Sequence, residues 1–84
     1  MHNKYEIEVC AQCPVNPSDT DIYAFTIESQ ALIEVEKIVK FFADNAAANK
    51  VFQEFLTQQC AVTLGAKVTS VGTHSGVKVT CCAP

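Results

Sequence analysis

The sequence predicts a single α+β domain in which two strands, two helices and two further strands follow one another. Two kinds of periodicity indicate this order: apolar residues alternate at both ends of the chain, whereas the middle carries them at helical spacing. The 84 residues, of which 49% are hydrophobic and 18% charged, fit one small core, so residues 1–84 are expected to form one domain. The natural packing is a four-stranded, mainly antiparallel sheet with both helices on one face.

The first half of the sheet is predicted from two alternating segments, residues 4–10 and 22–28. Between them, residues 11–21 contain two prolines together with Asn, Ser and Asp, which predicts a loop, and loops of this length are often functional. The side chains expected to share the buried face of these strands are those of Tyr5, Ile7, Val9, Tyr23, Phe25 and Ile27.

Two helices are predicted next, over about 31–45 and about 50–62. Ser29 is expected to cap the first and Asn49 the second, and Gly65 is expected to end the helical region. On the solvated face of the first helix, Glu36 and Lys40 are spaced for an i,i+4 pair. The expected buried stripes are Leu32, Val35, Ile38, Val39 and Phe42 in the first helix, and Val51, Phe52, Phe55 and Leu56 in the second.

The last two strands are predicted over residues 66–72 and 76–82, which are rich in Val and Thr. Residues 72–76 are expected to form the turn between them, with His74 in that turn. The face of the sheet opposite the helices alternates Lys, Thr, Ser and Cys, so it is expected to be polar.

Charge and composition exclude some classes of function. A net charge of −3 with only six basic side chains argues against a nucleic-acid groove. No apolar run is long enough to span a bilayer, and the first residues do not form a signal peptide, so a cytoplasmic location is expected. A domain this small gains stability from oligomerisation.

Glu54 is the first candidate functional residue, because it lies among large apolar side chains of the second predicted helix. A carboxylate in such surroundings costs free energy unless a partner satisfies it. The N–H pair of a purine or pterin ring would do so through two parallel charge-assisted hydrogen bonds. The alternative is a carboxylate that turns to solvent.

Five cysteines are many for this length, and in a reducing compartment they serve as free thiols, metal ligands or a nucleophile. Cys10 and Cys13 form one Cys-x-x-Cys pair, and Cys81-Cys82 would have to complete a zinc site. Adjacent cysteines in a strand point to opposite faces, which argues against that site. Cys60 has the spacing of a core residue.

Three short segments carry a family resemblance. The first is Cys13-Pro14-Val15, followed by an acid in the loop and by Ile22-Tyr23. The second is Lys37 and Lys40 followed by Phe52-Gln53-Glu54. The third is residues 53–61 together with Gly72-Thr73-His74. With the element order, they resemble the tunnelling-fold (T-fold) family of GTP cyclohydrolase I, pyruvoyltetrahydropterin synthase and QueF, the nitrile reductase of queuosine biosynthesis, an oxidoreductase of tRNA modification. The resemblance implies a homo-oligomer whose sheets join into a barrel and which binds a deazapurine, purine or pterin between subunits.

The first two segments are similar to QueF and imply its chemistry. Cys13 would attack the nitrile of 7-cyano-7-deazaguanine to form a thioimide, with Asp19 or Asp21 as the proton donor. Glu54 would hold the base, with Gln53 beside it, and Val35-Glu36 stands where the family has its Glu-Ser pair, which makes Glu36 a further candidate at the substrate. The third segment resembles a helix and an Ala-Thr-His turn of GTP cyclohydrolase I, which implies a role for His74 at the substrate.

Departures from these patterns leave the second half of the reaction open. The Arg-Gly-Gly of QueF after the third strand is replaced here by His74-Ser75-Gly76, so NADPH binding is largely unmatched. A QueF-like amidinotransferase of the archaeosine type needs no NADPH. Two alternatives remain. One is a zinc enzyme similar to GTP cyclohydrolase I or the pterin synthase, although Gly76 stands where the third metal ligand of the cyclohydrolase belongs. The other is a T-fold protein that binds a purine or pterin without catalysis.

Overall fold

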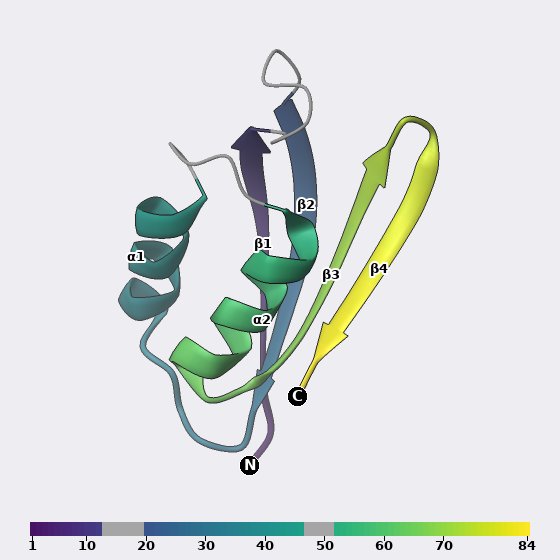
Figure 1. Ribbon diagram of the computed structural model, residues 1–84. Coiled ribbons are helices and arrows are strands. Elements are labelled where there is room, and N and C mark those ends of the chain that lie inside the picture. Colours follow the sequence, from purple (N-terminus) through teal and green to yellow (C-terminus); the bar gives the residue numbers. More distant parts are fainter. Residues whose placement is uncertain (13–19, 47–51) are drawn as a thin grey trace.

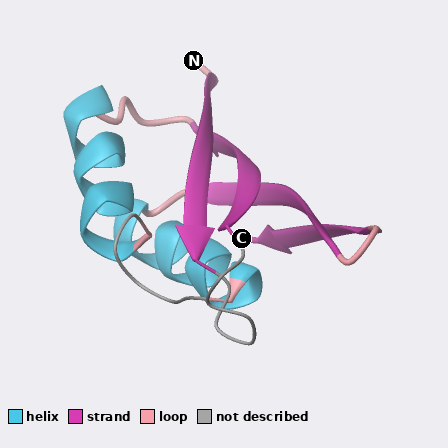
Figure 2. Cartoon of the chain, turned by 90° about the horizontal axis from the view of Figure 1, so that it is seen from above, coloured by secondary structure: helices cyan, strands magenta, loops and turns pink. Residues whose placement is uncertain are grey.

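The computed structural model describes residues 1–12, 20–46 and 52–84. Its elements follow the predicted order, with strands β1 (Asn3–Gln12) and β2 (Thr20–Ser29), helices α1 (Val35–Asn45) and α2 (Gln53–Leu64), and strands β3 (Lys67–His74) and β4 (Val77–Ala83) (Figure 1). All neighbouring strands pair antiparallel, and the sheet order is β1-β2-β3-β4. Both helices cover the same face of this sheet (Figure 2). The predicted α+β architecture is therefore confirmed.

The core lies between that face and the helices, and alternation along the strands decides which side chains enter it. In β2, Tyr23, Phe25 and Ile27 are fully buried, as predicted. In β1, Val9 is buried, while Tyr5 and Ile7 pack against the core and remain half-buried. The strands thus turn the predicted side chains toward the core.

Helix α1 begins four residues later than predicted, and Ser29 does not cap it. Ser29 is the last residue of β2, and its Oγ accepts a hydrogen bond from the Ala31 N–H at 3.1 Å, which closes a turn before the helix. The residue at the N-cap is Glu34, which makes no side-chain capping bond. The Asn49 cap predicted for the second helix lies outside the described residues.

The predicted buried stripe of the first helix is correct only in part. Ile38 and Phe42 are buried, together with Phe41, whereas Leu32, Val35 and Val39 are more than half exposed. The reason is geometric: with the helix starting at Val35, the side that meets the sheet is the one carrying Ile38, Phe41 and Phe42. Apolar side chains therefore remain on the outer surface of α1.

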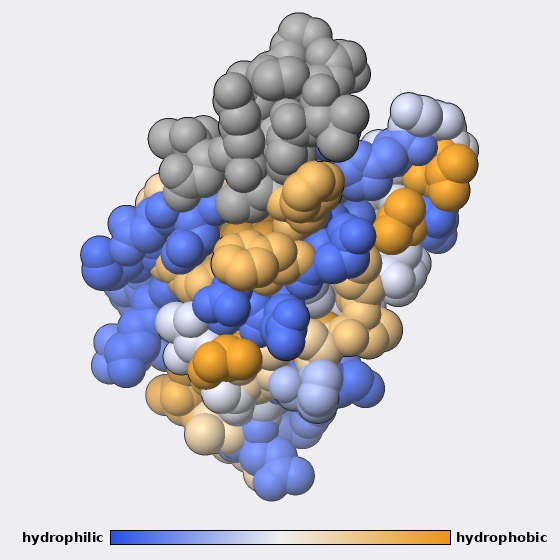
Figure 3. All heavy atoms as spheres, viewed as in Figure 1, coloured by the Kyte–Doolittle hydropathy of each residue, from blue (hydrophilic) through white to orange (hydrophobic). Residues whose placement is uncertain are grey.

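Helix α2 departs further from the prediction. Phe52 and Phe55 are 54% and 57% exposed, and only Leu56 of the described part of the predicted stripe is buried. The buried face is made instead by Gln53, Leu56, Thr57, Cys60 and Ala61. Gly65 ends the helix with φ +62°, as expected, and its N–H donates to the Ala61 carbonyl. The exposed phenylalanines contribute to the apolar surface seen over α2 in Figure 3.

Two predictions about the surface need correction. Lys40 pairs with Asp44 at 3.0 Å and not with Glu36. The last hairpin turns at Ser75-Gly76, so His74 belongs to β3 and not to the turn.

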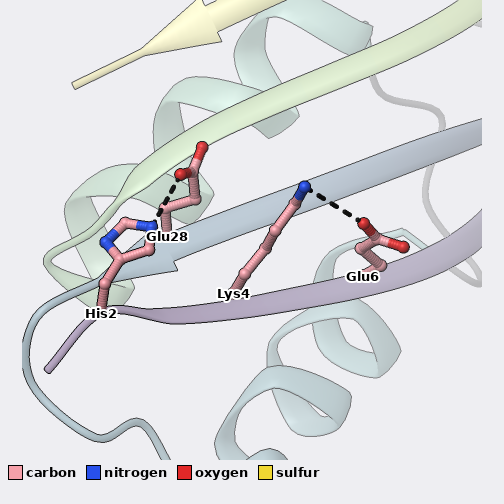
Figure 4. Close-up of polar contacts among 4 residues, drawn as sticks. All are labelled: His2, Lys4, Glu6 and Glu28. Atoms are coloured by element: carbon pink, nitrogen blue, oxygen red, sulfur yellow. Dashed lines mark hydrogen bonds and ion pairs between the residues drawn. The ribbon is translucent and has the colours of Figure 1, made fainter.

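Figure 4 shows two contacts near the start of β1: Nε2 of His2 lies 2.9 Å from a Glu28 carboxylate oxygen, and Lys4 pairs with Glu6 at 3.6 Å. No helix in the described ranges is long and apolar enough to cross a membrane.

Cys60 is a core residue, as predicted, and its burial predicts a loss of stability at alkaline pH. Desolvation raises its pKa from 9.0 to about 12, so between these values the unfolded chain loses a proton that the folded protein keeps. The contribution of the buried thiol to the free energy of unfolding is fully present below pH 9. It falls as pH rises above 9, by at most about 1.4 kcal/mol per pH unit. Urea unfolding from pH 8 to pH 10 should show a shallower fall in Cys60→Ala than in the wild type. Cys82→Ala, on the exposed face, is the control, and equal slopes for all three proteins would contradict the assignment.

Candidate active site

Two of the candidate residues, Asp21 and His74, lie where the sheet opens into a fork. Pairing of β2 with β3 stops at Ala24 and Val71, whereas β1 stays paired with β2 up to Gln12 and β3 with β4 up to His74. Beyond Ala24 and Val71 the two halves of the sheet diverge, as Figure 1 shows at the upper end of the strands. The segment 13–19, which lies outside the described residues, joins the two strand ends at this same end of the sheet.

Asp21 and His74 bridge the fork on the side of the helices. A carboxylate oxygen of Asp21 lies 3.1 Å from Nδ1 of His74, and the Tyr23 hydroxyl donates to the same oxygen at 3.4 Å. The Tyr23 and His74 rings are in contact, with centroids 5.7 Å apart. The structure thus brings together two of the residues predicted from the sequence, Asp21 and His74, and adds Tyr23, which was predicted only as core.

Gln53, predicted beside the substrate, is instead 1% exposed, and it anchors the first turn of α2 to the sheet. Its Nε2 donates to the Ser70 hydroxyl at 3.0 Å and to the Val79 carbonyl at 3.1 Å. The Thr57 hydroxyl donates to the Gln53 carbonyl at 2.7 Å and lies 2.6 Å from the Ser70 hydroxyl. This buried network fixes the start of α2 over β3 and β4.

The other amide atom of Gln53 points toward the fork. Because Nε2 faces the Val79 carbonyl, which can only accept, the amide orientation is determined and Oε1 is the remaining atom. Oε1 has no hydrogen-bond partner among the described residues, and it lies beside Gly72, against which the Tyr23 ring also packs. A buried acceptor without a donor costs about 1–3 kcal/mol.

Glu54 occupies the outer side of the same helical turn. It is exposed and lines a pocket of about 330 Å³ between α2 and the end of β4, together with Thr57, Gln58 and Cys81. The carboxylate is therefore accessible to a ligand, and its place in the first turn of α2 favours a negative charge. Of the two alternatives raised by the sequence, the structure gives a carboxylate that faces solvent from the rim of a pocket.

The two described cysteines that lie between the sheet and the helices, Cys60 of α2 and Cys81 of β4, are not activated. Burial raises the pKa of the Cys81 thiol, the nearby Glu54 carboxylate raises it further, and the Ser70 hydroxyl opposes both. Cys60 is fully buried. Cys10 and Cys82 are exposed on the opposite face. A nucleophilic cysteine needs a stabilised thiolate, so neither Cys60 nor Cys81 meets the requirement.

The remaining predicted site residues are placed as follows. Cys13 and Asp19 lie outside the described residues. Glu36 is exposed in the first turn of α1, and because α1 and α2 run antiparallel it lies at the opposite end of the helical layer from Glu54 (Figure 1). Cys81 and Cys82 point to opposite faces, as predicted. Within the described ranges, no group of three or more His, Cys, Asp or Glu side chains is placed to hold a metal ion.

Sequence reasoning missed the network of Gln53, Thr57 and Ser70. Ser70 was placed on the polar face of the sheet, yet it shares the buried face of β3 with Val68 and Gly72. The alternation of positions 68, 70, 72 and 74 along one face of β3 is the feature of the sequence that indicates a buried Ser70. The same alternation places His74 on the helix face of the sheet, where it meets Asp21.

Comparisons with known proteins support the fold. No family model and no curated protein matches the sequence. Among solved structures, the chain is similar to the archaeosine synthase QueF-Like in its apo form, with a TM-score of 0.83 and 17% sequence identity, over 98% of this chain and 90% of that chain. The resemblance to the T-fold seen in the sequence is therefore confirmed at the level of structure: this chain has the fold of the archaeosine synthase QueF-Like.

Proposed function

We propose that this chain is a cytoplasmic T-fold enzyme that binds 7-cyano-7-deazaguanine, as a free base or within RNA, and forms a thioimide with it through Cys13. The observation that carries the proposal is the structural match to an archaeosine synthase, combined with the arrangement at one end of the sheet. The Asp21–His74 pair lies at the fork, beside the described ends of β1 and β2, and Gln53 in the first turn of α2 lies next to Gly72 of β3. Glu54, in the same helical turn, lines a separate pocket with the end of β4.

The thioimide step balances without any further reactant. The Cys13 thiolate adds to the nitrile carbon, a C–S bond forms, and the nitrile π bond breaks toward nitrogen. An aspartate supplies the proton that this nitrogen needs, and the thiol proton leaves with a base. An amine that adds to the thioimide carbon would then form the amidine on the base, and the C–S bond would break to release the Cys13 thiolate, which is the step expected of an amidinotransferase.

Reduction fits this chain less well. All six basic residues are lysines, so no arginine is present to hold the phosphate of NADPH by a bidentate contact. His74, which occupies the position of the QueF Arg-Gly-Gly, is paired with Asp21. We therefore favour amidino transfer over an oxidoreductase reaction, and NADPH has no role in the proposed steps.

Base recognition is assigned to Glu54. Its carboxylate is accessible at the pocket rim, and the N–H pair of a guanine-like ring offers two parallel donors to it. We further propose that copies of the chain join their sheets into a barrel, so that a neighbouring subunit closes this pocket. The exposed Phe52, Phe55 and Val39 provide apolar surface for such contacts.

The test of base recognition is calorimetric binding of 7-cyano-7-deazaguanine to Glu54→Ala. Loss of two charge-assisted hydrogen bonds should weaken binding by about 100-fold. Glu34→Ala, which removes an exposed acid at the start of α1, is the control and should bind like the wild type. Binding to Glu36→Ala tests whether Glu36 of a neighbouring subunit contacts the base. Unchanged affinity in Glu54→Ala would remove the assignment.

Two other functions are distinguished by simple results. Stoichiometric zinc that is lost in Cys10→Ser and Cys13→Ser would favour a zinc enzyme similar to GTP cyclohydrolase I. Tight binding of the deazapurine without adduct or turnover would favour a T-fold binding protein.

A further inference from the structure

The face of the sheet opposite the helices carries a groove that the proposed function does not use. The groove encloses about 410 Å³ where β2 and β3 diverge. Its lining includes outward-pointing side chains from all four strands: Glu8 of β1, Ile22 and Ala24 of β2, Val71 and Thr73 of β3, and Lys78 of β4. A concave surface of this size can hold a small molecule. The groove is separate from the pocket that Glu54 lines at the end of β4.

The floor of the groove is apolar. Ala24 and Val71 form the last pair between β2 and β3, and Ile22 follows on β2 beyond that pair. The Ile22 side chain is 59% exposed, and Ala24 is exposed as well. A single exposed isoleucine is ordinary on a protein surface, but here three apolar side chains line one hollow. An aliphatic chain lying on this floor would remove apolar surface from water.

Opposite charges stand on the two walls of the groove. Glu8 lies across from Ala24 on β1, and Lys78 lies across from Thr73 on β4. The spacing of neighbouring strands separates the backbones of β1 and β4 by about 14 Å, and the fork increases this separation. A carboxylate and an ammonium group therefore face each other across the apolar floor.

Both of these charges are available to a ligand. Neither Glu8 nor Lys78 forms an ion pair with any residue that the structure describes. In contrast, Glu6, the preceding acid on the same face of β1, pairs with Lys4 (Figure 4). Asp21 also borders the groove, but its carboxylate is already in the ion pair across the fork. The groove thus presents one carboxylate and one ammonium group at opposite ends.

We infer that this groove binds a small zwitterion whose ammonium and carboxylate groups are separated by an aliphatic chain, such as an ω-amino acid. The ammonium group would bind Glu8, and the carboxylate would bind Lys78 and the Thr73 hydroxyl. The chain between them would cover Ile22 and Val71. A ligand with one charge leaves one wall unpaired, and a ligand with both charges on one carbon is too short to reach both walls. This inference concerns a second site and does not rest on the proposed function.

The test is a titration of the full chain with 6-aminohexanoate, followed in proton–nitrogen NMR spectra at low ionic strength. Saturable shifts are expected at the backbone amides of Ile22, Val71 and Thr73. Hexylamine and hexanoate each keep one charge, and glycine is too short. Each of these three should bind about 10-fold more weakly or worse, because a charge-assisted hydrogen bond is lost. Added salt should weaken binding of the zwitterion, since both charges are at the surface.

Variants of the two walls test the assignment of the charges. Glu8→Gln and Lys78→Gln should each weaken 6-aminohexanoate binding by about 10-fold. Glu6→Gln and Lys67→Gln, which change exposed charges outside the groove, are the controls and should bind like the wild type. The double variant Glu8→Lys with Lys78→Glu exchanges the walls, so it should recover binding with the zwitterion turned end for end. A merely structural role of either residue would not produce this recovery.

Several results would overturn the inference. It fails if 6-aminohexanoate binds no more tightly than hexylamine or hexanoate, or if either single variant keeps the wild-type affinity. It also fails if the zwitterion does not bind and the single variants instead form smaller species in sedimentation velocity, because Glu8 and Lys78 would then pair between copies of the chain. No deazapurine is present in these experiments, so none of these results decides the proposed function. A wild type that forms no thioimide would likewise leave this site untouched.

Discussion

Gly72→Ala is expected to cost about 2 kcal/mol of folding free energy, although glycine-to-alanine changes in strands are usually favourable. A Cβ at this position would lie 2.4 Å from Cδ1 and 2.8 Å from Cε1 of Tyr23. The Tyr23 ring is fully buried and contacts Phe25 and His74, so it cannot move aside without disturbing the core and the fork. Overpacking of this kind typically costs about 1–3 kcal/mol.

The competing effect is smaller. Gly72 does not have a positive φ, so alanine suits its backbone and would gain about 0.4–1 kcal/mol by restricting the unfolded chain. The clash should therefore decide the sign, and the melting temperature should fall by roughly 8–16 °C for a domain of this size.

Gly76→Ala provides the matched control. Gly76 has φ +82° and nothing lies within 4 Å of its Cβ position, so its cost should be about 1 kcal/mol from backbone strain alone. Thermal and urea unfolding of both variants test the comparison. A Gly72→Ala protein as stable as the wild type would show that the Tyr23 ring does not pack against Gly72 as described.

The sheet could be predicted from the sequence because its alternation is regular. Tyr23, Phe25 and Ile27 lie on one face of a strand, and a period of two leaves only one arrangement that buries all three. The turn at Ser75-Gly76 was misplaced because Gly72, which looks like a turn residue, is required inside β3 by the Tyr23 ring. A close approach between residues distant in sequence leaves no local signal.

The helices were predicted less accurately, since their inner faces are not their most apolar faces. In α2, the buried Gln53 and Thr57 satisfy each other and Ser70, whereas Phe52 and Phe55 remain exposed. A stripe chosen by hydrophobicity therefore selects the wrong side of this helix. Only knowledge that Ser70 faces inward from β3 would have indicated a buried polar partner.

The site was predictable as a set of residues but not as an arrangement. Asp21 and His74 were both candidates, yet their contact depends on a fork that opens where β2–β3 pairing ends. Glu54 was expected among apolar groups and instead lines a pocket near Cys81. Cys13 and Asp19 lie outside the described residues, so their roles remain predictions from the family resemblance.

Replacement of Cys13 is expected to have the largest effect on chemistry. Cys13→Ala should abolish the thioimide completely, because the C–S bond has no other suitable partner in the protein. The pKa of Cys60 and that of Cys81 are both raised, and Cys10 and Cys82 lie on the opposite face of the sheet. Binding of the base should survive, since Glu54 is unchanged and covalent bond formation follows recognition. Cys82→Ala is the matched control and should form the adduct at the wild-type rate.

Intact-protein mass spectrometry after incubation with 7-cyano-7-deazaguanine tests the central claim most directly. The account predicts a mass gain equal to one ligand per chain in the wild type and in Cys82→Ala, and none in Cys13→Ala. A folded wild-type protein that gains no mass, or a Cys13→Ala variant that gains the full mass of the ligand, would contradict it.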